Sequence, residues 1–395
     1  MSAENNLVGV RIVCVATVPF FIATQLGTQI AALLEAGMHV TVVTSPGPEL
    51  DRLPRHPNLR IHTLLIPRNI SPKADFLATL SLFRLLKQLS PQIVHSTTPK
   101  AGLIAAIAGF MASVPIRLHT FTGQPWLNLR GALRMAARQS DRLIGWLSTR
   151  CYADSLSQSQ FLVKEGLLPA NKICIVGEGS LSGVDVDRFD REKVGLETRE
   201  RVRKELGISS KTPVLLFIGR IARDKGIREL LTAAEQLHSQ AVDFSLLLLG
   251  PMDDEAGGHS SVSRPELEGH SYLHYLGYSA VPEEFIAASD VLCLPSYREG
   301  FGTVVIEAAA MGVPTVGTRI TGLVDAVVDG ETGILVAVRD SLALANALRT
   351  LIEKPDLRIR LGEQSRSRAR ECFSSDRVNA ALLAEYGHLL DMKNK

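Results

Sequence analysis

Cysteine is scarce in this chain of 395 residues, and no two cysteines form a C-x-x-C pair. The five are scattered along the sequence: Cys14, Cys151, Cys174, Cys293 and Cys372. An odd number without paired spacing argues against a disulfide framework and against a zinc site. We therefore expect a protein of the reducing cytosol.

Long hydrophobic runs are also lacking. Residues 12–34 carry no charge, but Pro19, Gln25 and Gly27 interrupt them, so we expect a strand over 11–17, a loop, and a helix over 24–36. The run 101–114 is too short to span a bilayer and reads as a buried helix. The polar, acidic first six residues lack the basic segment of a signal peptide. We expect neither a transmembrane helix nor a signal peptide.

The chain has little net charge, +2, but the charge is unevenly distributed. Residues 1–190 hold 18 Lys and Arg against 12 Asp and Glu, or +6, while the remainder holds 25 against 29, or −4. The basic first half suggests an anionic partner such as a phosphate or a membrane surface.

Apolar strands alternate with helical patterns throughout, which predicts an α/β protein with parallel sheets. The length favours two domains. The glycine- and serine-rich segment 177–185 is the expected link between them. Strands are predicted over 8–16, 39–44, 60–65, 93–96, 116–120, 151–153, 172–176, 213–218, 244–249, 273–276, 291–294, 315–317 and 333–336. The main predicted helices cover 25–36, 75–89, 100–111, 131–148, 197–206 and 376–392.

The most informative segment is 295–308, which follows the buried strand predicted over 291–294. Glu299 therefore lies at the carboxyl end of a strand, where open α/β sheets bind their ligands. Glu307 falls in the helix that follows and can reach the same place. Gly300 and Gly302 let backbone amides approach a ligand, and a helix N-terminus favours an anion. Two carboxylates can bind hydroxyl groups, and the nearby backbone amides can bind phosphate. This arrangement suits a sugar nucleotide, which carries both.

This segment resembles the Glu-x7-Glu signature of retaining GT-B glycosyltransferases of family 4. Further stretches follow the family pattern in order and spacing: 276–278, 287–291, 308–316, 322–325 and 329–336. The resemblance is tight over about 215–340 and looser elsewhere. It implies two doubly wound Rossmann-like domains facing a central cleft. We expect an acceptor-side domain over 1–188, a donor-nucleotide domain over 189–375, and a final helix, 376–395, that returns to the first domain.

Arg220 and Lys225 follow the first strand of the second domain. Two cations and a glycine at a strand end can form a diphosphate clamp. In the resembling family the matching residues hold the donor diphosphate and offset charge on the leaving group. The alternative is a solvated basic loop before a helix.

The resemblance assigns Glu307 to the ribose hydroxyls and Glu299 to the transferred sugar, without making Glu299 a nucleophile. The alternative for Glu307 is a glutamate that the helix dipole favours at a helix N-terminus. The alternative for Glu299 is a loop carboxylate paired with a cation. The other expected donor contacts are Gly277, Tyr278, Phe301, Gly302 and Thr303.

In the first domain, His119 lies near a predicted strand end and matches a histidine that reaches the donor sugar in the resembling family. It completes a catalytic set with Glu299, Arg220 and Lys225. His95 and Lys100 flank another strand end and are weaker candidates for the acceptor. A histidine at a strand end is otherwise most often structural.

No metal or other cofactor is expected to be required. The sequence Asp185-Val186-Asp187 imitates a D-x-D metal motif. However, it lies in a stretch that resembles the interdomain segment of family 4, so we do not interpret it as a metal site.

Residues 124–150 are the most unusual part of the first domain. Arg130, Arg134, Arg138 and Arg142 recur every four residues and form a slowly drifting stripe, which only Asp141 opposes. Basic and aromatic residues on an amphipathic helix suit an interfacial helix on anionic lipid. Arg130 and Arg134 are further acceptor candidates. The alternative is an ordinary surface helix.

The chain looks most like the bacterial branch that builds capsule, O-antigen and glycan precursors. The leading expectation is a retaining hexosyltransferase or N-acetylhexosaminyltransferase that moves a sugar from a nucleotide-diphospho-sugar, with uridine favoured, to a polyprenyl-diphosphate-linked saccharide. It would act as a peripheral protein on the cytoplasmic face of the inner membrane, without nucleic acid. Two alternatives keep the fold: a transferase with a small soluble acceptor, and a sugar-nucleotide 2-epimerase. A third alternative is a non-catalytic binding protein derived from the same fold, although the presence of Arg220, Lys225, Glu299 and Glu307 together weighs against it.

Overall fold

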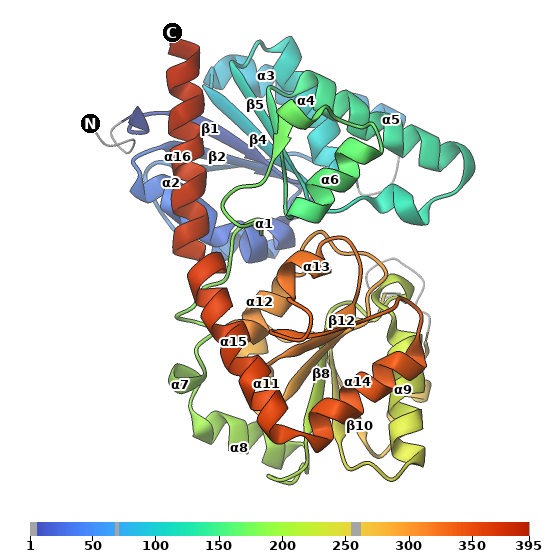
Figure 1. Cartoon of the computed structure of the whole chain (residues 1–395). Helices are drawn as coiled ribbons and strands as arrows, with labels where there is room; N and C mark the ends of the chain where they lie inside the picture. Colours follow the sequence, from blue (N-terminus) through green and yellow to red (C-terminus); the bar gives the residue numbers. More distant parts are fainter. Residues whose placement is uncertain (1–5, 68–70, 254–261, 395) are drawn as a thin grey trace. The chain divides into compact units, whose positions relative to one another are not determined.

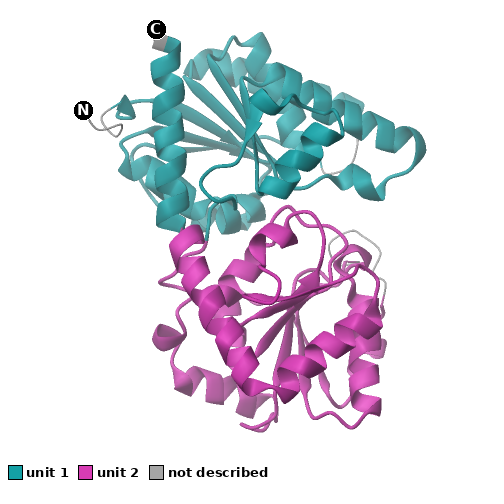
Figure 2. Ribbon diagram, viewed as in Figure 1, with its two compact units in different colours: residues 1–183, 375–395 teal, residues 184–374 magenta. Residues whose placement is uncertain are grey.

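The computed structural model describes residues 6–67, 71–253 and 262–394 (Figure 1). The chain divides into two compact units (Figure 2). Unit 1 comprises residues 1–183 and 375–395, and unit 2 comprises 184–374. The expected boundaries, after 188 and after 375, compare with 183 and 374 in the structure. The first division lies inside the glycine- and serine-rich segment 177–185.

Unit 1 is built on a parallel sheet in the order β3-β2-β1-β4-β5-β6-β7. Helices cover both faces of the sheet, so its inner strands are mostly buried, whereas the edge strand over 59–63 is exposed. All seven overlap the strands predicted from the sequence. They are β1 (Arg11–Val15), β2 (His39–Thr44), β3 (Leu59–Thr63), β4 (Ile93–Thr97), β5 (Ile116–Phe121), β6 (Arg150–Ala153) and β7 (Ile173–Cys174).

The helices of unit 1 are α1 (Pro19–Gln25), α2 (Gly27–Glu35), α3 (Pro72–Leu89), α4 (Pro99–Met111), α5 (Gly131–Leu147), α6 (Leu156–Lys164) and α16 (Ser375–Asn394). The prediction of a loop after β1 was wrong, because residues 19–25 form α1. Pro19 starts this helix, at a position where its missing N–H is no loss. The final helix, α16, buries Leu382 and Tyr386 in the core of unit 1.

Unit 2 has a six-stranded parallel sheet in the order β10-β9-β8-β11-β12-β13. Its strands also match the predictions: β8 (Val214–Ile218), β9 (Ser245–Leu249), β10 (Leu273–Gly277), β11 (Val291–Leu294), β12 (Thr315–Thr318) and β13 (Gly333–Val336). The helices are α7 (Arg191–Val194), α8 (Leu196–Glu205), α9 (Ile227–Ser239), α10 (Arg264–Glu268), α11 (Pro282–Ala288), α12 (Thr303–Ala310), α13 (Leu323–Ala326), α14 (Ser341–Glu353) and α15 (Pro355–Phe373).

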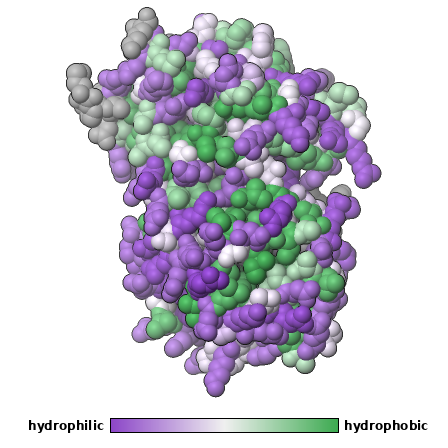
Figure 3. Space-filling model, in the orientation of Figure 1, coloured by the Kyte–Doolittle hydropathy of each residue, from purple (hydrophilic) through white to green (hydrophobic). Residues whose placement is uncertain are grey.

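The strand order reverses once in each sheet, between β1 and β4 in unit 1 and between β8 and β11 in unit 2. Such reversals leave a crevice at the carboxyl ends of the two central strands, where doubly wound sheets bind ligands. On the face drawn in Figure 3, hydrophilic residues cover much of the surface of each unit, and hydrophobic residues form patches among these hydrophilic residues. Within the described part of the chain, no helix is both long and apolar enough to cross a membrane.

Candidate active site

The reversal in unit 2 brings together the residues that the sequence singled out. The turn after β8 carries Arg220 and leads into a 3-10 turn, η5 (Arg223–Lys225). The loop after β11 carries Glu299 and leads into α12, which contains Glu307. Because β8 and β11 are neighbours, both loops emerge at the same point of the sheet edge.

Lys225 and Glu299 form an ion pair, with 2.6 Å between Nζ and Oε1. Both side chains are largely buried, with 20% and 13% of their surface exposed. The backbone holds the two loops together, because the amide of Tyr297 donates to the carbonyl of Asp224 at 2.8 Å. The alternative interpretation, in which Lys225 is a solvated loop cation, therefore does not fit.

Gly226 makes this close approach possible. Its φ of +70° is a left-handed conformation, and a Cβ there would lie 2.1 Å from the carbonyl oxygen of Pro295. Only glycine allows the chain that carries Lys225 to pass so close to the end of β11.

Arg220 lies in a network that the sequence analysis did not foresee. Its guanidinium binds the carboxylate of Asp253, which follows β9, and lies 4.0 Å from that of Asp224. Asp224 also pairs with Arg298, at 3.4 Å. The sequence did offer one sign of this network, because Asp253 lies just beyond a predicted strand. The network holds Arg220 at the sheet edge while leaving 40% of its side chain exposed.

Glu307 differs from Glu299 in having no partner. Among the described residues it makes no hydrogen bond or ion pair, although it is half-buried in α12. Burial raises its pKa to about 7, an effect that nearby Arg188 opposes and Glu283 reinforces. A carboxylate in this state gains from any ligand that donates hydrogen bonds to it.

The segment before Glu307 prepares the N-terminus of α12 for a ligand. Gly302 occupies the N-cap with φ +90°, and no side chain caps the helix there. Phe301 anchors the segment, since its ring is buried against Phe373 at 5.0 Å between centroids. Thr303 is the first helical residue. The backbone of this turn, rather than the side chain of Phe301, is thus the part suited to meet an anion.

Gly277 and Tyr278 lie farther along the same edge. Gly277 ends β10 and Tyr278 follows it. Because β9 separates β10 from β8, both residues are about 10 Å from the end of β8 at the usual spacing between strands. The carbonyl of Gly277 accepts from the amide of Gly250, and half of the surface of Tyr278 is exposed.

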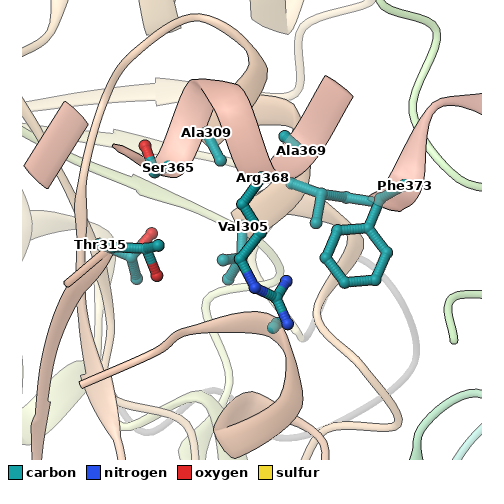
Figure 4. Close-up of a pocket in the computed structure, with 10 residues that line it drawn as sticks. Val305, Ala309, Thr315, Ser365, Arg368, Ala369 and Phe373 are labelled. Carbon is teal, nitrogen blue, oxygen red and sulfur yellow. The ribbon is translucent and has the colours of Figure 1, made fainter. Parts of the chain in front are cut away.

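A small cavity lies behind α12 (Figure 4). Val305 and Ala309 of α12 line it together with Arg368 and Phe373 of α15. At about 10 Å³ it has room for about one water molecule. Arg368 donates to the carbonyl of Asp325 and stacks over Phe373. The cavity belongs to the packing of unit 2 and is too small for a sugar nucleotide.

The structure places His119 of unit 1 in the interior, with 1% of its surface exposed. Its strand, β5, continues to Phe121, so His119 lies within the strand rather than at its end. Nδ1 is 3.0 Å from Oγ of Ser96, and the ring packs against Gly102 of α4, where a Cβ would approach it to 2.4 Å. Burial, reinforced by nearby His95, lowers its pKa to about 3. These contacts show that His119 takes part in the packing of unit 1, and its predicted contact with a sugar stays a prediction.

His95 is buried as well. Its two ring nitrogens lie 2.5 Å from the hydroxyl of Tyr386 and 2.8 Å from that of Thr120, and burial lowers its pKa to about 4. Lys100, in the first turn of α4, pairs with Asp75 of α3 at 2.8 Å. His95 thus joins α16 to the sheet, and Lys100 joins two helices near the sheet edge. Their predicted contacts with an acceptor stay predictions.

The arginines of residues 124–150 do not share one environment. Arg130 is exposed at the N-cap of α5, while Arg134 and Arg138 each lie 5.8 Å from the ring of Trp126. Asp141 turns inward and accepts from Nε1 of Trp126 at 2.7 Å. It therefore does not neutralise the exposed arginines.

Comparisons with known proteins agree with this geometry. The family described as glycosyl transferases group 1 matches residues 198–368, and the glycosyl transferase 4-like domain matches 22–179. The capsular polysaccharide biosynthesis glycosyltransferase CapM of Staphylococcus aureus is 32% identical over 365 residues, which cover 92% of this chain and 93% of that protein. The chain belongs to the family-4 glycosyltransferases of the GT-B fold. It is therefore an enzyme of the hexosyltransferase type.

Two further similarities help to place this glycosyltransferase. A D-inositol 3-phosphate glycosyltransferase of Pseudarthrobacter chlorophenolicus is 26% identical over 91% of this chain and 90% of its own length. The Anabaena protein HepE, in complex with UDP and glucose, superposes with a TM-score of 0.76 at 19% identity, over 94% of this chain and 98% of its own. The second similarity shows the fold.

In the described part of this glycosyltransferase, no group of three or more His, Cys, Asp or Glu residues could hold a metal ion. Asp187 of the D-x-D stretch is instead paired with Lys193 at 2.5 Å.

Proposed function

We propose that this glycosyltransferase transfers a sugar, with retention of configuration, from a uridine diphosphate sugar to a polyprenyl-diphosphate-linked saccharide in bacterial surface polysaccharide synthesis. The observation that carries the proposal is the cluster at the strand reversal of unit 2. There the paired Lys225 and Glu299, the exposed Arg220 and the unpartnered Glu307 meet beside the N-terminus of α12.

The cluster can exchange its internal pairs for a ligand. Lys225 and Arg220 are held by carboxylates, and a diphosphate would take over part of both pairings as it binds. The amides of the turn at 301–303 would meet the same phosphates. Glu307 has no pair to give up and would accept hydrogen bonds from the ribose hydroxyls. The UDP and glucose of HepE support this class of donor.

The proposed transfer uses no protein nucleophile. Glu299, released from Lys225, would hold hydroxyls of the transferred sugar, while the acceptor attacks from the face that the diphosphate leaves. A phosphate oxygen of the leaving group would take the acceptor proton. Lys225 and Arg220 would stabilise the charge that develops on the diphosphate. No metal is required in this scheme.

Two observations favour a lipid-linked acceptor. CapM is named for capsular polysaccharide biosynthesis, and the first half of this chain carries an excess of six positive charges. Since such an acceptor resides in a membrane, we propose a peripheral enzyme at the cytoplasmic surface. A soluble acceptor is the second candidate, favoured by the similarity to D-inositol 3-phosphate glycosyltransferases. The epimerase alternative lacks such support.

A donor and acceptor panel tests the proposal. Thermal unfolding is measured with UDP, GDP, ADP and their sugars, and transfer is measured with polyprenyl-diphosphate sugars in vesicles and with inositol phosphate in solution. Stabilisation by uridine nucleotides with transfer only to lipid supports the proposal. Transfer to inositol phosphate supports the second candidate. An unchanged melting temperature with every nucleotide contradicts the donor site.

A further inference from the structure

Residues 185–189 of unit 2 form a tight turn. Oδ1 of Asp185 accepts hydrogen bonds from the backbone amides of Asp187 and Arg188, both at 3.0 Å. The amide of Phe189 donates to the carbonyl of Asp185 at 2.9 Å, and Phe189 is buried in the core of unit 2. An aspartate that binds amides two and three residues on holds the backbone in one conformation. The first aspartate of the D-x-D stretch therefore fixes the turn that carries Arg188.

The side chain of Arg188 reaches the loop that follows β10. Its Nη2 donates to the carbonyl of Ala280 at 2.9 Å and pairs with Glu283 of α11 at 2.8 Å. The guanidinium also lies 5.1 Å from the ring of Phe189. This loop, residues 278–281, begins with Tyr278, which is one of the predicted donor contacts. Arg188 thus links the turn at 185–189 to a loop of the candidate donor site.

Both members of this ion pair act on Glu307. Burial raises the pKa of Glu307 to about 7, while Arg188 lowers this pKa and Glu283 raises it. Glu283 is largely buried, with 16% of its side chain exposed, whereas 44% of the side chain of Arg188 is exposed. A change in either charge therefore alters the fraction of Glu307 that is ionised near neutral pH.

Other charged side chains around α12 bind partners of their own. Helix α15 packs against α12, as does β12, which carries no charged residue. The pairs are Glu299 with Lys225, Arg366 and Arg370 with Asp190, Arg368 with the carbonyl of Asp325, and Glu284 of α11 with Arg201. Of the charges that the structure describes, those of Arg188 and Glu283 have the largest effect on Glu307.

We propose that Arg188 is a positioning residue of the donor site, which holds the loop after β10 and places a positive charge beside Glu307, so that Glu307 meets the ribose hydroxyls as a carboxylate. Glu283 limits this effect because its negative charge opposes that of Arg188. The inference rests on the proposed function, which assigns Glu307 to the ribose. An ionised carboxyl group can accept hydrogen bonds on both oxygens, and hydrogen bonds to a charged group are the stronger ones.

A role limited to tethering the loop makes a different prediction. Arg188→Gln and Glu283→Gln break the same ion pair, so a tether would be weakened in both variants and nucleotide affinity would change in the same direction. A role through charge gives opposite effects. Without Arg188, Glu307 stays protonated to a higher pH, and without the charge of Glu283 it ionises at a lower pH.

The test is calorimetric titration of the full chain with UDP over a range from about pH 5.5 to 9, wide enough to follow the ionisation of one carboxyl group. The proteins are wild type, Arg188→Gln, Glu283→Gln and the charge-conserving Arg188→Lys. The matched controls are Arg201→Gln and Glu284→Gln, which break an ion pair of 2.6 Å at the next residue of α11. Thermal unfolding is measured on every variant.

We expect the midpoint of the rise in UDP affinity to move to higher pH in Arg188→Gln and to lower pH in Glu283→Gln. At pH 7, Arg188→Gln should bind UDP about three- to tenfold more weakly than wild type, whereas Glu283→Gln should bind it at least as tightly. Arg188→Lys and both controls should keep the midpoint of wild type.

Three results would overturn the inference. The first is a midpoint that neither Arg188→Gln nor Glu283→Gln moves, and the second is a shift of both in the same direction. The third is a shift in Arg188→Lys or in the controls as large as that in Arg188→Gln.

Failure of the proposed function would look different. If wild type binds no nucleotide, the donor site is contradicted and the role of Arg188 falls with it. Binding of GDP or ADP in place of UDP contradicts the choice of uridine alone, and the same titrations are then made with that nucleotide, because its ribose is the same. A pH dependence that Glu307→Gln removes but that Arg188→Gln and Glu283→Gln leave in place contradicts the role of Arg188 alone.

Discussion

The candidate residues of the two units differ in what surrounds them. In unit 2, Lys225 and Glu299 pair with each other at the carboxyl ends of adjacent strands, and Arg220 stays 40% exposed. In unit 1, His119 and His95 lie inside the sheet region and are bound to Ser96, Tyr386 and Thr120. Charged pairs at a strand end can open to a ligand, whereas a buried neutral histidine serves packing. Residue type and approximate position do not distinguish these outcomes.

Loss of the cation in unit 2 should have the largest effect. We expect Lys225→Ala to slow release of the nucleoside diphosphate from the donor about 10²- to 10³-fold, as for removal of a group that stabilises transition-state charge. Single-turnover kinetics with the donor identified in the panel measures this.

The matched control is Arg223→Ala, which removes an exposed cation from the same turn. Equal rates in the two variants would mean that Lys225 contributes only to the general positive charge of the turn and does not bind the donor diphosphate.

In unit 1, His119→Ala should destabilise the fold and leave the rate of sugar transfer nearly unchanged. Removal of the buried ring and its hydrogen bond to Ser96 should lower the free energy of unfolding by about 2 kcal/mol, with little change in transfer rate per folded molecule. Denaturant unfolding and single-turnover rates separate the two effects. His62→Ala, at an exposed position of β3, is the control. A large loss of rate with full stability would return His119 to the catalytic set.

The same histidines predict acid sensitivity. Burial lowers the pKa of His119 to about 3 and that of His95 to about 4, from an ordinary value of 6.5. The unfolded chain therefore binds more protons below pH 6.5, so stability falls as the pH drops from about 6.5 toward 4. Unfolding curves of His119→Ala should show a shallower fall over this range. An unchanged slope would argue against a buried neutral His119.

Glu307 should set the pH dependence of nucleotide binding. Since burial raises its pKa to about 7, the ionised acceptor of ribose hydrogen bonds is lost as the pH falls through 7. UDP affinity in calorimetry should rise between pH 6 and 8 for wild type and stay flat for Glu307→Gln. We expect Glu307→Ala to weaken binding about tenfold, the effect of losing a hydrogen bond to a charged group. Identical affinities in all three proteins would exclude the ribose role.

The smallest effect is expected for the link between α16 and the sheet. Tyr386→Phe removes the hydroxyl that bonds to Nδ1 of His95 and should destabilise the chain by about 1 kcal/mol. Denaturant unfolding measures it, with Tyr278→Phe at a half-exposed position as the control. No difference between the two would mean that the short contact adds nothing to stability.

Much of the fold was predictable because it depends on local patterns. Most strands coincide with apolar runs, since a parallel sheet covered on both faces buries consecutive residues, and only the edge strand β3 is mainly exposed. Helix α1 was wrongly predicted as a loop, because Pro19 and a short apolar run give no clear helical period. The site in unit 2 was predictable for a related reason: most of its residues follow two strands directly, and the ends of neighbouring strands must meet.

The arginine stripe shows where such reasoning stops. Residues four apart advance about 40° around a helix beyond a full turn, so Arg130 and Arg142 differ by about 120° and cannot share one face. Arg134 and Arg138 stack over Trp126 instead, which leaves Met135 and Trp146 outermost. Phe110 joins them only because α4 packs beside α5.

The sequence by itself thus determined the two parallel sheets, the order of their elements and the charged groups at the ends of β8 and β11, because all of these follow from periodicity and adjacency along the chain. Tertiary structure decided the rest. It buried His95 and His119, joined Arg220 to Asp253 and brought Phe110 of α4 beside Trp146 of α5. Each of these depends on which face of an element meets a segment distant in sequence, and no local pattern contains that information.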